Sequence, residues 1–152
     1  MDTGHRVCFR VIIDPSTPVS SLLEAPTVTG VSKPLIVEGP VKASEAIRMC
    51  GEGCEVVVVV DSEGRIRKAV SLARLASVVA TRGDIDVSEV HDEVSVLSVD
   101  DSVEKLIEEL VFHGGPTVIV DSRGRPLYSV GTQILSRILQ EEVDVEEVKA
   151  AD

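Results

Sequence analysis

An internal duplication is the feature of the sequence that most constrains the fold. Val56–Val60 runs into Asp-Ser-Glu-Gly-Arg at 61–65, and Val118–Val120 runs into Asp-Ser-Arg-Gly-Arg at 121–125. The two turns are offset by 60 residues, and the apolar pattern keeps this register on both sides of them. Solenoid repeats usually have periods of about 20 to 50 residues in three or more copies. Two longer copies instead indicate a duplicated subdomain with pseudo-twofold symmetry.

Each copy is predicted to contain a short strand, an amphipathic helix, a two-stranded hairpin and a closing helix. Apolar residues at the i, i+3, i+4, i+7 spacing predict the helices. The Asp-Ser-x-Gly-Arg stretch predicts the hairpin turn, because Asp and Ser can bond to the backbone and Gly accepts a left-handed conformation. As helix caps we expect Asp101 before the first helix of the second copy and Ser71 before the closing helix of the first.

The predicted architecture is an α+β fold made of tandem β-α-β-β-α repeats. We expect residues 1–16 to form an N-terminal strand extension and residues 17–82 and 83–140 to form the two repeats. Residues 141–152 are acidic, and we expect a helical or frayed tail there.

The charge balance argues against a surface for nucleic acid. The chain has 26 acidic and 15 basic residues and a net charge of −11, whereas nucleic-acid binding usually needs a basic patch. The N-terminus has no apolar signal core, and the longest strongly apolar run, Val56–Val60, is far too short to span a bilayer. We therefore expect a cytoplasmic protein without a membrane partner. The lack of Asn and the scarcity of Gln are typical of a thermophilic source.

The order of these pieces resembles the CBS (cystathionine-beta-synthase-type) domain family, in which two repeats form one globular pair. The resemblance covers roughly residues 17–140. It rests on Val87-Ser88-Glu89-Val90 before a short strand, on Asp101-Ser102-Val103, and on the hairpin around Asp121-Ser-Arg-Gly124. Val19-Ser20-Ser21-Leu22 is similar to the corresponding lead of the first repeat, followed by an insertion around 27–34.

This resemblance implies two clefts between the sheets that can bind AMP, ADP, ATP or S-adenosylmethionine as a ligand, with no cofactor required. In the family, adenine packs in an apolar slot, and a Gly-x-x-Thr/Ser-x-x-Asp stretch after the hairpin contributes a hydroxyl for phosphate and an Asp for the ribose hydroxyls. The ligand-binding candidates that follow from it are Val37, Val58, Lys68, Ser71, Arg74, Leu97, Val118 and Thr132.

Both copies depart from that stretch. In the first, Lys68 replaces the Gly and Arg74 replaces the Asp, while Ser71 keeps the hydroxyl. In the second, Gly131 stands at the hydroxyl position and Ile134 at the Asp position, where we expect a core residue. Neither copy can therefore bind ribose in the usual way. Lys68 and Arg74 could take a phosphate by charge-assisted bonds or could lie on a solvated face; if one site binds, we expect the first.

The cysteines give no clear metal or disulfide framework. Cys8, Cys50 and Cys54 are an odd count, which argues against a disulfide framework. The Cys50/Cys54 pair has two of the four ligands that a structural zinc usually takes. We therefore expect no metal, a buried Cys50 and a loop thiol at Cys54, with redox sensing as a more distant alternative.

Two functions remain open at this point. One is a regulatory module that senses an adenine nucleotide or another phosphorylated ligand; the other is a ligand-free dimerisation or protein-interaction module with degenerate sites. No nucleophile, base and oxyanion site come together in the sequence, so we expect no enzyme. In either case we expect a homodimer, because the apolar faces of one pair are hard to cover, together with a regulated partner protein that the sequence does not identify.

Overall fold

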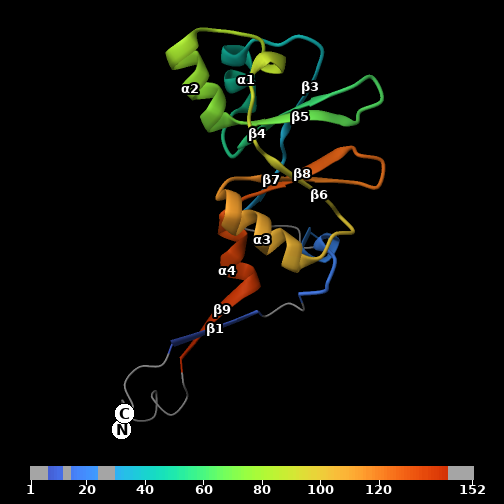
Figure 1. Cartoon of the computed structure of the whole chain (residues 1–152), viewed down its shortest axis with the longest axis vertical. Helices are drawn as coiled ribbons and strands as arrows, with labels where there is room; N and C mark the ends of the chain where they lie inside the picture. The colour runs from blue at the N-terminus through green and yellow to red at the C-terminus, as the bar shows by residue number, and fades with distance from the viewer. Residues whose placement is uncertain (1–6, 12–14, 24–29, 144–152) are drawn as a thin grey trace.

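The computed structural model describes residues 7–11, 15–23 and 30–143, and it contains two α+β repeats stacked sheet to sheet (Figure 1). The first repeat comprises β3 (Leu35–Glu38), α1 (Ala43–Cys50), β4 (Val56–Val60), β5 (Ile66–Ser71) and α2 (Leu72–Arg82). The second comprises β6 (Ser95–Ser98), α3 (Val103–His113), β7 (Thr117–Val120), β8 (Pro126–Val130), a 3-10 turn η3 (Thr132–Ile134) and α4 (Leu135–Ile138). The predicted pair of β-α-β-β-α repeats is confirmed.

The two sheets share one topology, as the duplication predicts. In the first, β3 is parallel to β4, and β4 is antiparallel to β5. In the second, β6 is parallel to β7, and β7 is antiparallel to β8. The hairpins shift register at equivalent points, between Val59 and Val60 and between Ile119 and Val120. A short strand β2 (Val31–Ser32) extends the second sheet alongside β8, which the sequence did not predict.

Both faces of the central strands are buried, which explains their nearly continuous runs of valine. One face of each sheet packs against the helices of its own repeat. The opposite faces meet between the two sheets, where the buried apolar residues are Val56, Val58, Val60, Ala69, Val118 and Val120. The helix-facing sides form two further separate cores, one in each repeat.

Each helix-facing core is completed by a segment that precedes the other repeat. The 3-10 turn η1 (Val19–Leu23) leads into the first repeat, yet Val19 and Leu22 are buried in the core of the second. The turn η2 (Val87–Glu89) leads into the second repeat, yet Val87 and Val90 are buried in the core of the first. The two repeats therefore interlock.

Backbone hydrogen bonds fasten these lead segments at the helix N-termini. Val103 N at the start of α3 donates to Thr17 O at 2.8 Å, and Ala43 N at the start of α1 donates to Ile85 O at 2.8 Å. Each bond satisfies one of the N–H groups that the first turn of a helix leaves without an intrahelical partner. The same geometry appears twice, because both leads have the same apolar spacing.

Two local predictions proved wrong. Ser102, and not Asp101, caps α3: its Oγ accepts from Lys105 N, while the Asp101 carboxylate accepts from Ser98 N. Residues 141–143 of the predicted helical or frayed tail instead belong to strand β9 (Leu139–Val143). This strand pairs antiparallel with β1 (Val7–Val11), the predicted N-terminal strand, in a two-stranded ribbon that leaves the body (Figure 1). Residues 144–152 lie outside the described part of the chain.

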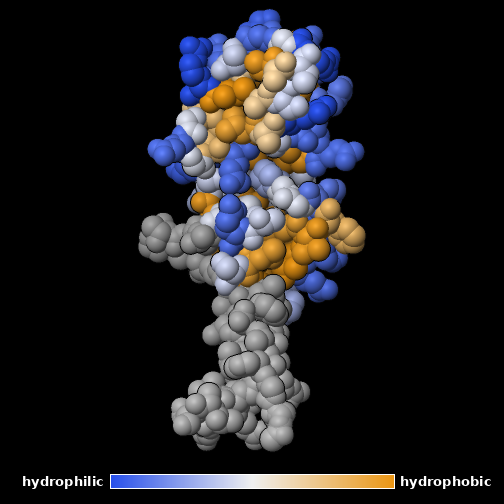
Figure 2. All heavy atoms as spheres, turned by 90° about the vertical axis from the view of Figure 1, so that its left-hand side faces the viewer, coloured by the Kyte–Doolittle hydropathy of each residue, from blue (hydrophilic) through white to orange (hydrophobic). Residues whose placement is uncertain are grey.

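Apolar side chains also reach the surface on the helix side of the molecule. Figure 2 shows hydrophobic areas on this face in both the upper and the lower half of the body. The exposed large apolar residues of the helices are Met49 in α1 and Val111 and Phe112 in α3. Phe112 is 81% exposed and Val111 is 66% exposed.

The interlock predicts that a residue of the first lead stabilises the second repeat. Leu22→Ala removes a fully buried side chain and should lower the free energy of unfolding by about 2 to 5 kcal/mol. Urea denaturation followed by circular dichroism measures the change. Ser21→Ala, at the exposed neighbour, is the control and should stay within about 0.5 kcal/mol of the parent. Equal effects of the two substitutions would contradict the interlock.

Candidate functional site

The first repeat has a cavity that includes Lys68, one of the eight predicted ligand-binding residues. It measures about 410 Å³ and lies between β5 and the segment that leads into β6; it is lined by Ile66, Arg67, Lys68, Ala69, His91, Asp92, Val94 and Val96. A second hollow of about 300 Å³ shares Asp92 and Val94 with it and reaches Ser71. One wall comes from each repeat, so the cavity lies at their junction.

Ser71 is the N-cap of α2, as the sequence predicts. Its Oγ accepts from Arg74 N at 3.1 Å. Its own backbone N–H donates to the Asp92 carboxylate at 2.8 Å. The chain therefore supplies an anion of its own at the position where the family resemblance implies a ligand phosphate. The sequence carries no local signal for this contact, since Asp92 lies 21 residues beyond Ser71.

The two predicted cations, Lys68 and Arg74, are tied to the segment between the repeats. Lys68 Nζ donates to Ser88 O, and Arg74 Nε donates to His91 O at 3.0 Å. Both acceptors are carbonyls, and the described part of the chain offers neither side chain an ion pair. Hydrogen bonds therefore hold the Lys68 and Arg74 side chains in place, but no carboxylate of the described residues pairs with them.

The predicted apolar candidates lie deeper than the cavity. Val37 and Leu97 are buried in the two helix-facing cores, and Val58 and Val118 are buried between the sheets. Thr132 is exposed in η3. Their contacts with a ligand stay a prediction.

The apolar wall of the cavity consists instead of Ile66, Ala69, Val94 and Val96. Val96 is 42% exposed, whereas its neighbour Leu97 is buried. Adjacent residues of a strand face opposite sides of the sheet. Strand alternation is therefore the signal that could have selected Val96 from the sequence.

In the second repeat, the chain itself occupies the equivalent region. Gly131 N donates to Gly30 O at 2.7 Å, and Ser32 Oγ lies 2.8 Å from Ser129 Oγ. A side chain on Gly30 would meet the backbone of Ile134, because a β-carbon there would lie 2.5 Å from Ile134 N. Ile134 is fully buried, so its predicted role in the core is confirmed.

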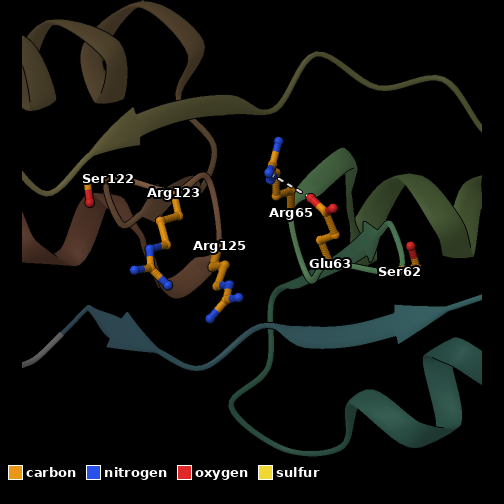
Figure 3. A pocket seen from close by; sticks show the side chains of 6 residues that line it. All are labelled: Ser62, Glu63, Arg65, Ser122, Arg123 and Arg125. Atoms are coloured by element: carbon orange, nitrogen blue, oxygen red, sulfur yellow. Dashed lines mark ion pairs between the residues drawn. The ribbon is translucent and has the colours of Figure 1, made fainter.

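The two hairpin turns are held by their aspartates. Asp61 Oδ1 accepts from the backbone of Glu63 and Arg65, and Asp121 Oδ1 accepts from the backbone of Arg123 and Arg125. The bond from the backbone of the arginine that ends each turn is the main cause that holds the pKa of each Asp carboxyl below 3.8. The side chains of the two turns face a common hollow, which Figure 3 shows from close by.

Two further aspartates fasten the segment between the repeats. Asp84 accepts from the hydroxyl of Ser44 at 2.6 Å and from its backbone N–H at 2.9 Å, which lowers the pKa of Asp84. Asp86 accepts from the backbone N–H of Ser88 at 2.9 Å and from its hydroxyl at 2.8 Å, which lowers the pKa of Asp86.

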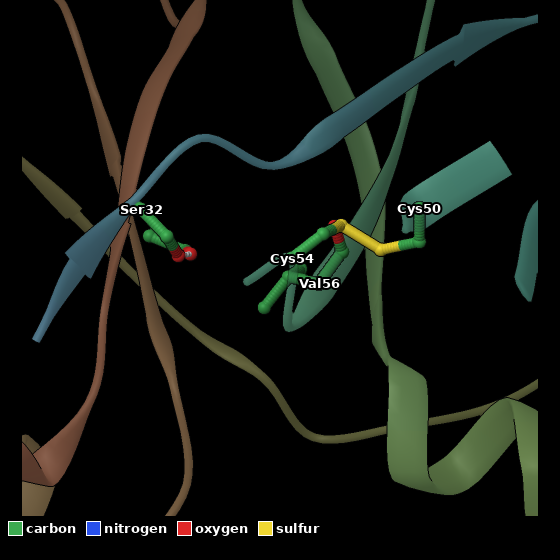
Figure 4. Close-up of a disulfide and its surroundings, with 5 residues drawn as sticks. Ser32, Cys50, Cys54 and Val56 are labelled. Carbon is green, nitrogen blue, oxygen red and sulfur yellow. Dashed lines mark hydrogen bonds between the residues drawn. A yellow bond between two sulfur atoms is a disulfide. The ribbon is translucent and has the colours of Figure 1, made fainter. Parts of the chain in front are cut away.

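The cysteines differ from the prediction: Cys50 and Cys54 are joined by a disulfide across the five-residue loop after α1 (Figure 4). The expectation of a free loop thiol at Cys54 was wrong, because the Gly51 and Gly53 turn brings the two Cα atoms within 5.3 Å. That separation lies in the range that a disulfide requires. Cys54 Sγ also lies 3.6 Å from Val56 O, a contact rather than a hydrogen bond, since a bridged sulfur carries no proton. An odd cysteine count does not exclude a single short-range bridge.

Within the described ranges, no group of three or more His, Cys, Asp or Glu residues is placed to hold a metal ion. The described helices include none that is long and apolar enough to cross a membrane.

Known structures share this architecture. The CBS domain pair of protein MJ0100, in complex with 5-methylthioadenosine and S-adenosyl-L-methionine, matches 81% of this chain and 95% of its own length, with a TM-score of 0.63 and 18% identity. The CBS domain-containing protein TM0935 from Thermotoga maritima matches 80% of this chain and 94% of its own length, with a TM-score of 0.62 and 16% identity. This chain has the fold of a CBS domain pair.

A further match is the cytosolic domain of the Mg²⁺ channel MgtE in complex with ATP, with a TM-score of 0.57 and 20% identity. It covers 68% of this chain and only 44% of the MgtE chain, so the CBS pair corresponds to part of that domain. No family model and no curated protein sequence matches the chain. The similarity to these proteins therefore lies in the fold. The pattern of buried apolar residues can maintain this fold at low sequence identity.

The lowered pKa values of the four aspartates predict acid sensitivity with a defined sign. A carboxyl whose pKa is lower in the folded state stabilises the fold above its unfolded value, 3.8, and that contribution is lost as the pH falls through the folded pKa. We expect the melting temperature to be nearly constant from pH 7 to about 5 and to fall below about pH 4. The Asp84→Asn variant, which cannot ionise, should show a shallower fall in a circular-dichroism pH series. An unchanged slope would contradict this account.

Proposed function

We propose that this CBS pair is a non-catalytic regulatory module that binds a phosphorylated adenosine ligand in the cavity between β5 and residues 91–96. The observation that carries the proposal is the composition of that cavity. Its apolar wall, which includes Ala69, Val94 and Val96, adjoins the cations Arg67 and Lys68. The volume of about 410 Å³ lies within the usual range of small-molecule sites, about 300 to 1,000 Å³.

Asp92 gives this cavity a carboxylate, the group that the first repeat lacks because Arg74 stands at the usual Asp position. The family resemblance implies a carboxylate that accepts bonds from the ribose hydroxyls. A carboxylate has about four acceptor positions, and Asp92 uses its oxygens for the backbone N–H groups of Ser71 and Glu93. The remaining acceptor positions can bind the ribose hydroxyls. Asp92 would thus replace the family's Asp from the wall of the cavity opposite β5. Adenine would then lie against Val96, with phosphate toward Lys68.

The position of the cavity suits a regulatory role. Lys68 belongs to the first repeat, and Asp92 and Val96 belong to the segment that leads into and forms the first strand of the second. A ligand that contacts both walls favours one arrangement of the repeats over others. Binding can move a partner protein only through such a preference. The MJ0100 CBS pair solved with 5-methylthioadenosine and S-adenosyl-L-methionine supports an adenosine ligand, and the MgtE cytosolic domain solved with ATP supports a phosphorylated one.

A second candidate function is a ligand-free interaction module. The observation that favours it is the self-occupied second site, where Gly30 O accepts from Gly131 N and β2 lies against β8. In the first site, the Asp92 carboxylate likewise occupies the backbone N–H of Ser71 with a group of the chain itself. The open cavity in the first repeat favours the ligand-binding function over the ligand-free interaction module.

The ligand test is a comparison of matched substitutions. Val96→Phe fills the cavity from a side chain that is already partly exposed, and it should abolish binding of AMP, ADP and ATP. The unsubstituted protein should gain about 2.7 kcal/mol of stability at a ligand concentration one hundredfold above Kd. Thermal-shift assays followed by calorimetry measure both effects.

Ile36→Phe is the control, because Ile36 occupies the equivalent strand position of the first repeat, is 49% exposed and lies outside this cavity. It should leave binding unchanged. Loss of binding in Ile36→Phe alone would move the site to the second cleft. Silence of the unsubstituted protein at millimolar ligand would contradict the binding function and favour the interaction module.

We further propose that the pair forms a homodimer through the exposed apolar residues of its helices. The support is the exposure of Met49 in α1 and of Val111 and Phe112 in α3. Burying an aromatic side chain of this size contributes strongly to interface energetics. A second copy offers the same face, as a twofold interface requires.

A charge at the most exposed of these positions should dissociate the dimer. Phe112→Glu places two carboxylates at a twofold interface and should raise the dimer Kd at least about tenfold, equivalent to 1.4 kcal/mol. Sedimentation equilibrium measures the mass, which should be twice the monomer mass for the unsubstituted protein. Leu127→Glu, on β8 and away from the helices, should remain dimeric. A monomeric parent protein would contradict the proposal.

A further inference from the structure

The tips of the two hairpins meet and enclose a hollow that no sequence argument singled out. Its volume is about 720 Å³, and it is lined by Ser62, Glu63 and Arg65 of the first turn and by Ser122, Arg123 and Arg125 of the second. Figure 3 shows Arg123 and Arg125 on one side of the gap and Arg65 with Glu63 on the other. None of these residues lines the cavity between β5 and residues 91–96.

The turns are joined reciprocally, which fixes the arginine stems. Ile66 N donates to Gly124 O at 2.8 Å, so backbone links the two hairpins. A β-carbon on Gly64 would lie 3.8 Å from the Arg125 side chain, and one on Gly124 would lie 3.9 Å from the Arg65 side chain. Each arginine stem therefore packs over the glycine of the opposite turn. This packing positions the Arg65 and Arg125 side chains at the hollow.

The side chains that line the hollow carry more positive than negative charge, with three arginines and one glutamate. Arg65 pairs with Glu63 at 2.7 Å. The position of Glu63 in the first turn is taken by Arg123 in the second. Neither Arg123 nor Arg125 has a side-chain hydrogen bond or ion pair among the described residues. Asp61 and Asp121 do not line the hollow: their Oδ1 atoms accept from the turn backbone, and the charges of Arg65, Arg123 and Arg125 also help to lower their pKa values.

This excess of positive charge is local, since the chain as a whole carries a net charge of −11. Figure 3 shows Arg123 and Arg125 extending together, whereas Arg65 extends away from them and pairs with Glu63. Like charges repel one another, so the two unpaired guanidinium groups of the second turn favour an anion beside them. Arginine presents paired donors in a planar fork that matches phosphate oxygens, and the hydroxyls of Ser62 and Ser122 add two further donors. The site is exposed, so a single charge would be bound weakly, whereas a chain of phosphoryl groups can engage both turns.

We propose that the hollow between the hairpin turns is a binding site for a linear polyphosphate group, held by Arg123 and Arg125 from one repeat and Arg65 from the other. The ligand chemistry is a chain of at least two phosphoryl groups, free or attached to a nucleoside. Ser62 and Ser122 donate to its oxygens. The site is separate from the adenosine cavity and does not depend on it.

The deciding experiment is calorimetry with inorganic tripolyphosphate at low ionic strength. Arg123→Glu is the central variant, because it gives the second turn the Asp-Ser-Glu-Gly-Arg sequence that the first turn already has, and the fold accommodates that sequence. It should weaken binding at least tenfold, and Arg123→Ala/Arg125→Ala should remove it. The exposed pair Arg48→Ala/Arg82→Ala changes the net charge equally, lies outside the hollow and should keep the affinity within twofold.

Three outcomes would overturn the proposal: no binding to the unsubstituted protein, equal affinity in Arg123→Glu, or equal weakening in the control pair. Circular dichroism of each variant checks that it is folded. Two further arms, measured in the Val96→Phe variant so that the adenosine cavity is blocked, identify the source of the phosphoryl chain: if a nucleotide is the ligand, ATP should bind more tightly than tripolyphosphate, and adenosine should not bind. Val96→Phe separates the two sites, since it should abolish adenosine-ligand binding and leave tripolyphosphate binding intact.

Discussion

The structure depends on one interaction, the burial of each lead segment in the core of the other repeat. Leu22 and Val19 fill the second repeat, and Val87 and Val90 fill the first. A half of this size buries a modest fraction of its surface, so the missing apolar residues matter to its stability. Interlocking supplies these apolar residues, and it makes the two sheets face each other across the core around Val58 and Val118.

Both candidate sites are consequences of that interlock. The segment that carries η2 must return across the end of β5, and this places Asp92 beside Ser71 and Val96 opposite Ala69. Sheet-to-sheet packing also brings the two hairpin turns together, so that Arg65 and Arg125 each pack on the glycine of the opposite turn. Both proposed sites therefore lie between the repeats. A ligand that binds in either place would favour one relative position of the repeats.

Local physical chemistry explains which predictions were confirmed. Ser71 was identified as an N-cap because its hydroxyl acts on a backbone group three residues away. The equivalent inference for Asp101 failed because the carboxylate accepts from Ser98 N instead, leaving Ser102 to cap the helix. The Cys50–Cys54 bridge was missed because counting cysteines says nothing about the tight glycine turn between them.

The sequence by itself determined the duplication, the order of strands and helices, and the burial of residues such as Ile134, because these follow from periodic apolar patterns and local turn chemistry. It could not determine how the two copies are fitted together. The exchange of lead segments, the Asp92 carboxylate at the Ser71 N–H and the hollow lined by both hairpin turns all join residues far apart along the chain. Only tertiary packing decides such contacts, because their energy depends on where the complete cores bring the backbone.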